Sequence, residues 1–163
     1  MKKINFLTQA AMIAALYVVL TLAISAFGLA SGAIQVRVSE ALTILPYFTP
    51  AAIPGLFIGC LLSNIITGCA LFDIIFGSIA TLLGAVGTYL LRRHKWLAPV
   101  SPIIANTIIV PFVLSYVYGT PGTIPYLMLT VGIGEVLSCG VLGMILLFAL
   151  NKYRTTLFSI DAS

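Results

Sequence analysis

The stretch Val38-Ser-Glu-Ala-Leu-Thr-Ile-Leu-Pro-Tyr-Phe-Thr-Pro-Ala-Ala-Ile-Pro54 decides how this chain folds. Its three prolines divide an otherwise apolar region, because the residue before a proline is pushed out of the helical conformation. We therefore expect a turn near residues 48–52. A short helical segment, Val38–Tyr47, precedes this turn, and a longer one, Ala51–Ala70, follows it.

The composition around this stretch indicates a membrane protein. Of the 163 residues, 61% are hydrophobic and 7% are charged, whereas about 25% is usual in globular domains. A soluble domain of this length could not bury so much apolar surface. The net charge is +4, but the basic residues flank apolar segments and form no basic face, which argues against a nucleic-acid partner. The sequence predicts an all-α protein of the lipid bilayer, with residues 1–163 as one transmembrane domain.

A membrane-spanning helix needs about 20 mainly apolar residues. The uncharged run from Ile4 to Val36 is too long for the apolar core of a signal peptide, about 7–15 residues, so the first span is expected to be retained. The short segment Val38–Tyr47 reaches only about 15 Å as an α-helix, so it must be shielded by its neighbours or enter the bilayer partway. The clearest spans are Phe6–Phe27, Asp73–Leu91, Pro99–Val117 and Pro125–Leu150.

Seven of the eight basic residues form three clusters, within Lys2–Lys3, Arg92–Lys95 and Lys152–Arg154. Basic residues near membrane spans favour the cytoplasmic side. If all three clusters are cytoplasmic, an even number of crossings must separate each from the next. Four crossings followed by two satisfy this rule and use every apolar segment. The prediction is a bundle of six transmembrane helices in the cell membrane, with a short second helix and both termini cytoplasmic.

Four charged residues, Arg37, Glu40, Asp73 and Glu135, stand instead in apolar surroundings. Ionisable groups at membrane depth cost roughly 2.5–3.5 kcal/mol each, so they are kept for a reason. In the predicted topology they converge on the outer half of the bundle, together with two asparagines. We expect a pocket that opens to the outside, with these substrate-binding residues: Arg37, Glu40, Asn64, Asp73, Asn106 and Glu135.

Several of these residues also have structural interpretations. Arg37 and Glu40 are three apart and could pair with each other. Asp73 could be a helix N-cap, which would not exclude contact with a ligand. Asn64 and Asn106 could be hydrogen-bond partners between helices. Glu135 has no cationic residue near it in the sequence, so it gives the clearest indication of a functional role.

The chain lacks the residues of common catalytic sites. No phosphate-binding Gly-x-x-x-x-Gly-Lys loop is present, and the single histidine, His94, is too isolated for a triad or a zinc site. Cys60, Cys69 and Cys139 are odd in number and lie in apolar runs, which favours packing over disulfides or a metal cluster. We expect no enzyme activity, metal or cofactor, and a role in binding or transport.

Small residues mark faces on which helices pack closely. Gly55, Gly59, Ser63 and Thr67 repeat every four residues, and Ala10, Ala11, Ala14 and Ala15 form two interleaved Ala-x-x-x-Ala pairs. Taken alone, these patterns favour packing within the chain over a surface for a partner.

Three runs resemble the QueT family: Ile34-Gln-Val-Arg-Val-Ser-Glu-Ala-Leu42, Gly59-Cys-Leu-Leu-Ser-Asn-Ile-Ile-Thr-Gly68 and Asp73-Ile-Ile-Phe-Gly-Ser-Ile-Ala-Thr-Leu82. The resemblance implies the substrate-binding S component of an energy-coupling-factor (ECF) transporter for queuosine precursors. It also implies that Ala10, Ala11, Ala14 and Ala15 dock to a transmembrane coupling subunit. Two ATPase subunits on other chains would supply the missing P-loop.

The implied substrate is a deazapurine such as 7-aminomethyl-7-deazaguanine. A carboxylate can accept from its N1–H and N2–H₂ groups, Arg37 or an asparagine can donate to O6, and a second carboxylate can bind its ammonium. Two other interpretations remain open: a stand-alone proton-coupled transporter that uses Glu135, and an S component for another vitamin. The loops Ser31–Gln35 and Gly119–Ile124 are candidates for closing the pocket.

Overall fold

The computed structural model describes residues 2–27 and 37–154, and the candidate closing loop Ser31–Gln35 lies outside them. The described residues form helices and connections with no strand, which confirms the all-α prediction. In chain order the elements are α1 (Lys2–Ala26), η1 (Val38–Tyr47), α2 (Ala52–Ile66), α3 (Leu71–Leu90), α4 (Val100–Tyr116), α5 (Ile124–Glu135), η2 (Val136–Leu142) and α6 (Gly143–Asn151).

Three helices are long and apolar enough to cross a membrane: Lys3–Ala26, Leu71–Leu90 and the continuous helix Ile124–Asn151, which joins α5, η2 and α6. The chain is therefore a multi-pass membrane protein. Two further helices, α2 and α4, are also apolar but have only 15 and 17 residues. The crossings beyond these three remain a prediction.

The third predicted span, Ala51–Ala70, is longer than the helix α2 that the structure contains. Gly68 adopts a φ of +73°, and the N–H groups of Gly68 and Cys69 donate to the carbonyls of Ile65 and Asn64 at 3.1 and 3.0 Å. This is the Schellman pattern that ends a helix. The chain consequently turns four residues earlier than expected, and residues 67–70 form the connection to α3.

The short segment η1 lies inside the bundle, where it contacts α1, α2, α3, η2 and α6. Residues 39–46 are all buried, so the expected shielding by neighbouring helices is confirmed. The helix type differs from the expectation, since η1 is a 3₁₀ helix. A 3₁₀ helix rises about 2.0 Å per residue, so ten residues extend about 20 Å rather than 15 Å.

The 3₁₀ geometry sorts the side chains of η1 by chemistry. With three residues per turn, Glu40, Thr43 and Pro46 lie in one row. The apolar residues of the other rows join the main core, where Leu42, Ile44 and Leu45 pack with residues of α1, α2 and α6. The element thus presents one polar row to the interior while its remaining faces stabilise the bundle.

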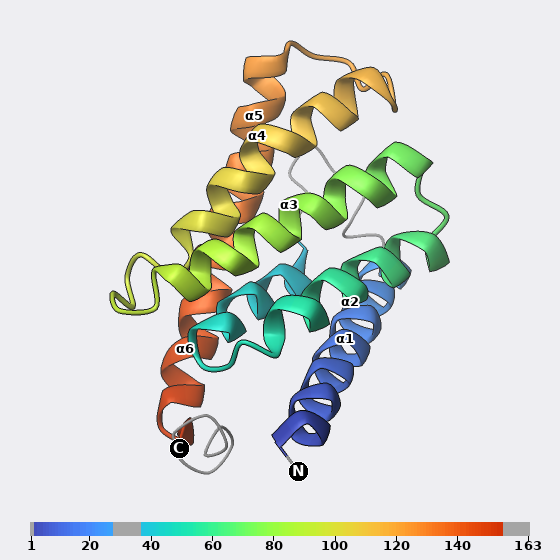
Figure 1. Ribbon diagram of the computed structural model, residues 1–163. Coiled ribbons are helices and arrows are strands. Elements are labelled where there is room, and N and C mark those ends of the chain that lie inside the picture. The colour runs from blue at the N-terminus through green and yellow to red at the C-terminus, as the bar shows by residue number, and fades with distance from the viewer. Residues whose placement is uncertain (1, 28–36, 155–163) are drawn as a thin grey trace.

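The N-terminal end of α1, the α3–α4 connection and the C-terminal end of α6 lie towards the same end of the molecule, along the left and bottom of Figure 1. The three basic clusters belong to these segments. Their cations meet aromatic rings: Arg92 lies 4.2 Å from the Tyr89 ring centroid, and Lys95 lies 5.4 Å from that of Phe148. Cations and aromatic rings together are typical of a membrane–water interface.

The helices α1 and α2 approach closely at two glycines. A Cβ atom on Gly55 would lie 2.7 Å from the carbonyl oxygen of Ala10, and one on Gly59 would lie 3.0 Å from that of Ala14. Ala10 and Ala14 are therefore buried, whereas Ala11 and Ala15 are exposed. Helix α2 covers Ala10 and Ala14 and leaves Ala11 and Ala15 exposed, so of the four alanines expected to dock a partner only these two lie at the surface of this chain.

Candidate substrate-binding site

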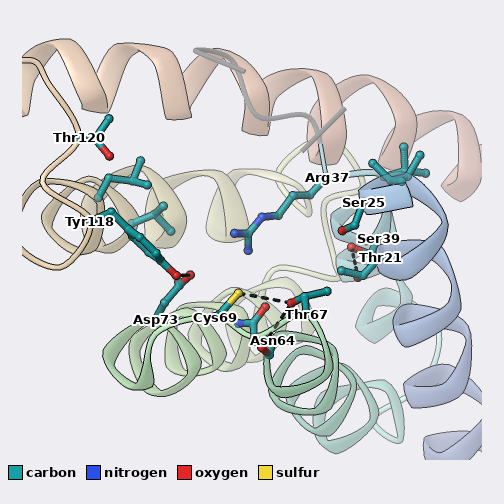
Figure 2. A pocket seen from close by; sticks show the side chains of 14 residues that line it. Thr21, Ser25, Arg37, Ser39, Asn64, Thr67, Cys69, Asp73, Tyr118 and Thr120 are labelled. Atoms are coloured by element: carbon teal, nitrogen blue, oxygen red, sulfur yellow. Dashed lines mark hydrogen bonds between the residues drawn. The ribbon is translucent and has the colours of Figure 1, made fainter. Parts of the chain in front are cut away.

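A cavity of about 420 Å³ lies where α1, η1, α2, α3 and α4 meet. It is at the end of the molecule away from the basic clusters, where α1, α2 and α4 end and where η1 and α3 begin (Figure 1). Figure 2 shows the fourteen residues that line it: Thr21, Ile24, Ser25, Arg37, Val38, Ser39, Asn64, Thr67, Cys69, Asp73, Val110, Leu114, Tyr118 and Thr120.

Arg37 precedes η1 in an extended conformation, with φ −100° and ψ 98°. Its guanidinium group points into the middle of the cavity (Figure 2). Among the described residues, no hydrogen bond or ion pair joins this group to Glu40, although both side chains line one small void. A planar fork of donors is thus free to meet a carbonyl or carboxylate in the cavity.

Asp73 lines the cavity from the first turn of α3. The N-cap of α3 is Ala70, so the N-cap interpretation of Asp73 is wrong. Instead, its Oδ2 accepts a hydrogen bond from the Tyr118 hydroxyl at 2.9 Å. That hydroxyl also accepts from the Ala70 N–H at 3.1 Å. Partial desolvation of this half-exposed side chain, together with the bond to Asp73, raises the pKa of Tyr118 to about 12. The phenol therefore remains protonated and donates to the carboxylate at physiological pH.

Asn64 approaches Asp73 from α2, across a gap that a glycine leaves open. A Cβ atom on Gly77 would lie 3.2 Å from the Asn64 Nδ2 and 3.3 Å from the Asp73 Oδ1. The Asn64 Nδ2 has one weak interaction, with the Cys60 sulfur at 3.7 Å. Its amide and the carboxylate thus lie close together at the cavity wall.

The other three predicted residues form a buried cluster beneath the cavity. Glu40, Asn106 and Glu135 are 2%, 4% and 6% exposed. The Asn106 Nδ2 donates to the Glu135 Oε2 at 3.1 Å and to the Glu40 Oε2 at 3.4 Å. The second Glu40 oxygen accepts from the Tyr17 hydroxyl. One side-chain amide therefore holds two carboxylates together in the protein interior.

The cluster and the cavity adjoin each other. Arg37, Glu40, Asn106, Val110, Val131 and Glu135 line a small void of about 10 Å³, roughly the space for one water molecule. Arg37 and Val110 line both spaces. The structure thus brings all six predicted residues together in two tiers, with Arg37, Asn64 and Asp73 above and Glu40, Asn106 and Glu135 below.

The long last helix changes its winding at this cluster. Directly after Glu135, η2 forms a π-helix, a type of turn that is frequent at functional sites. Cys139 on this turn donates through its Sγ to the Glu135 Oε2 at 3.2 Å and to the Glu40 carbonyl at 3.4 Å. The two carboxylates and this thiol come within 4.8 Å of one another. Each is already hydrogen-bonded to neighbouring groups, and we assign no metal to them.

Sequence reasoning missed four polar residues of the site: Tyr17, Thr43, Tyr118 and Cys139. Tyr17 is a phenol inside an apolar helix and 1% exposed, and its position within a predicted span was an available signal. Cys139 lies four residues after Glu135, which places both on one helix face. The Tyr118 contact had no such signal, since its partner Asp73 lies 45 residues away. The three cysteines are free thiols, as expected.

The helices and this two-tiered polar interior define a multi-pass membrane protein with a binding-sized cavity at one end. The sequence model of the QueT transporter family matches residues 7–152, and the chain belongs to this family. One relative, named "Queuosine precursor transporter QueT", from Lactococcus lactis subsp. cremoris (strain MG1363), is 37% identical over 86 residues. These residues cover 52% of this chain and 50% of that protein, so the match spans about half of the relative's length. No solved structure matches this chain.

Proposed function

We propose that this chain is the membrane-embedded, substrate-binding subunit of an ECF transporter that takes up a queuosine precursor. The substrate class is a 7-deazaguanine such as 7-aminomethyl-7-deazaguanine, and the chain itself is not an enzyme. Family membership and the relative's name support a transport role. The observation that carries the ligand class is the cavity in which the Arg37 guanidinium faces Asp73 and Asn64 (Figure 2).

The size and chemistry of the cavity suit this ligand. Small-molecule sites usually measure about 300–1,000 Å³, and this cavity measures about 420 Å³. Asp73 accepts from N1–H and N2–H₂ of the guanine edge, while Arg37 or Asn64 donates to O6. The ammonium group of the aminomethyl compound reaches towards Glu40 and Glu135, where charge-assisted hydrogen bonds are roughly twice as strong as neutral ones.

The orientation follows from the two ends of the molecule. The end with the basic clusters and aromatic rings faces the cytoplasm, and the cavity faces outward. The segment η1 runs between these ends, because Arg37 lines the cavity while Tyr47 lies 6.0 Å from Arg154. With η1, α2 and α4 counted as crossings, the chain crosses the cell membrane six times and both termini are cytoplasmic.

Energy comes from other chains. The coupling subunit docks against the exposed face of α1 at Ala11 and Ala15, where small side chains permit close helix contact. Two ATPase subunits bound to the coupling subunit hydrolyse ATP. Ala10 and Ala14 support this surface indirectly, because they fix α1 against α2.

A second candidate is a stand-alone proton-coupled transporter. The buried pair Glu40–Glu135 favours it, since adjacent carboxylates inside a membrane are typical of proton pathways. Co-purification separates the two candidates. An S component is recovered with a coupling subunit and two ATPases and needs ATP for uptake, whereas a secondary transporter accumulates substrate alone in vesicles with a proton gradient.

The direct test is equilibrium binding of 7-aminomethyl-7-deazaguanine to the purified chain, with the variants Asp73→Asn and Ser101→Ala. Asp73→Asn removes the charge that faces the guanine edge, so the affinity should fall about tenfold to a hundredfold, as for a charged hydrogen bond. Ser101 lies in the first turn of α4, at the other end from the cavity, and Ser101→Ala should bind normally. Absence of binding by the wild-type chain, or equal binding by all three, contradicts the assignment.

A further inference from the structure

Tyr118 occupies a position in the site that no sequence motif explains. It lies in the connection between α4 and α5, two residues after α4 ends. Its hydroxyl donates to the Asp73 Oδ2 at 2.9 Å and accepts from the Ala70 N–H at 3.1 Å. A single phenol therefore joins the α4–α5 connection to the start of α3 and to the α2–α3 connection.

These two bonds fix how Asp73 faces the cavity. A carboxylate at a helix start can rotate about its side-chain torsions, but the bond to Tyr118 holds one oxygen. The other oxygen, Oδ1, stays next to the Asn64 amide above Gly77, where a Cβ atom would be 3.3 Å from Oδ1 and 3.2 Å from Nδ2. An acceptor and a donor thus both lie near Gly77 at the cavity wall, and a planar amide edge needs one of each.

The same bonds also hold the wall of the cavity. The connection after Tyr118 turns through two glycines with positive φ, Gly119 at +59° and Gly122 at +136°. Thr120, between them, lines the cavity. In the described part of this connection, Tyr118 makes the only side-chain hydrogen bonds to the α2–α3 side. Loss of the Tyr118 hydroxyl would therefore detach the α4–α5 connection from the start of α3 and from the α2–α3 connection.

We propose that Tyr118 is a positioning residue that ties the α4–α5 connection to α3 and thereby orients Asp73 towards the guanine edge of the substrate. This inference rests on the proposed function, because the guanine edge is the chemistry that it reads. Tyr118 would set specificity without contacting the ligand through its own hydroxyl, which both bonds already occupy.

The test compares Tyr118→Phe with a matched control, Tyr116→Phe. The Tyr116 side chain is 77% exposed and stacks on Phe112 at 6.4 Å between ring centroids, and its hydroxyl forms no hydrogen bond among the described residues. Tyr118→Phe should weaken binding of 7-aminomethyl-7-deazaguanine about fivefold to tenfold, the net effect of a hydrogen bond. The analogue without the 2-amino group should lose less affinity, so discrimination between the two ligands should shrink. Tyr116→Phe should leave both unchanged.

A double-mutant cycle with Asp73→Asn separates positioning from a general structural role. If Tyr118 acts through Asp73, Tyr118→Phe should weaken binding much less in the Asp73→Asn background than in the wild type. Equal losses in both backgrounds, or no loss in the single variant, would overturn the proposal.

A second readout needs no ligand. Cys69 lines the cavity next to Ala70, whereas Cys60 and Cys139 are buried, so a membrane-impermeant maleimide reports on Cys69. Its labelling from outside intact cells should be severalfold faster in Tyr118→Phe and unchanged in Tyr116→Phe. An unchanged labelling rate of Cys69 in Tyr118→Phe would show that Tyr118 does not hold the α4–α5 connection to α3. If the wild-type chain binds no deazaguanine, the proposed function fails, while this labelling still decides whether Tyr118 holds the wall.

Discussion

Glu135 is buried in the continuous helix Ile124–Asn151, with 6% of its side chain exposed. Its Oε2 accepts from Asn106 at 3.1 Å and from Cys139 at 3.2 Å, and a second carboxylate, Glu40, shares the Asn106 amide. Arg37 lines the small void beside both carboxylates, but among the described residues no ion pair or hydrogen bond joins it to either of them. A cationic group on the ligand could bind these two carboxylates. A variant of Glu135 therefore tests whether the site recognises the charge of the ligand.

Glu135→Gln keeps the size of the side chain but removes its charge. Binding of the aminomethyl compound should weaken by about 1.5–3 kcal/mol, or tenfold to a hundredfold, as expected for a hydrogen bond to a charged group. Binding of the uncharged 7-cyano compound should change far less. Isothermal titration of both ligands measures the difference.

Ser138→Ala is the matched control, because Ser138 is buried in the same helix and its hydroxyl has no hydrogen-bond partner among the described residues. If Glu135→Gln weakens both ligands alike, Glu135 reads the guanine edge, and Asp73 or Glu40 binds the amine. If neither ligand responds, Glu135 only holds helices together, and the assignment of the lower tier fails.

Among individual site residues, the sequence predicted the charged ones best. Arg37, Glu40, Asp73 and Glu135 stood out because an ionisable group in an apolar span carries a desolvation cost, and all four face the two adjoining spaces. Their hydrogen-bond partners were not predictable in the same way. The phenol of Tyr17 meets Glu40 only because η1 folds back beside α1, and such a contact depends on tertiary packing.

At the scale of helices, the prolines located η1 correctly but not its winding. The bounds Val38–Tyr47 were predicted and found, and Pro50 lies in the turn that follows. Pro46 and Pro54 lie inside η1 and α2, so only one of the three prolines marks the boundary. The 3₁₀ winding was not predicted, because runs of this type longer than three or four residues are uncommon. Packing on five neighbouring elements stabilises it here. This winding puts Glu40 and Thr43 in one row above Cys139.

The close contact of α1 with α2 predicts a specific effect of Gly59→Ala. The added Cβ would lie 2.8 Å from the Tyr17 Cβ and 3.0 Å from the Ala14 carbonyl oxygen, so the two helices must separate. Overpacking of this kind costs about 1–3 kcal/mol. The melting temperature in detergent should fall, and ligand binding should weaken, because Tyr17 would move from Glu40.

Gly132→Ala provides the same substitution in a permissive place. A Cβ at Gly132 would be 3.5 Å from Thr107, an ordinary contact, and alanine is favoured over glycine in a helix by about 0.5–1 kcal/mol. This variant should be as stable as the wild type or slightly more stable. Equal melting temperatures for both variants would mean that α1 and α2 are not held as closely as described.

For the whole molecule, the two faces of α1 separate stability from coupling. The face with Ala10 and Ala14 is covered by α2, while Ala11 and Ala15 are exposed. The Ala-x-x-x-Ala pattern alone could not distinguish these faces, since both pairs have the same spacing and the choice depends on where α2 packs. The proposed partner surface therefore makes a sharper prediction than the pattern did.

Ala11→Trp should abolish ATP-driven uptake of the queuosine precursor in cells while leaving the affinity of the purified chain and its melting temperature unchanged. The bulky ring blocks close approach of a coupling subunit but points away from both α2 and the cavity. Leu16→Trp is the control, because Leu16 is also exposed yet lies about 140° around the helix from Ala11, at 100° per residue. Its uptake should remain close to that of the wild type.

Ala14→Leu should behave differently from both, because it enlarges a buried contact with Gly59 and should lower stability first. If Ala11→Trp transports normally, the partner does not bind this face, and uptake without any partner would favour the proton-coupled alternative that the pair Glu40–Glu135 allows.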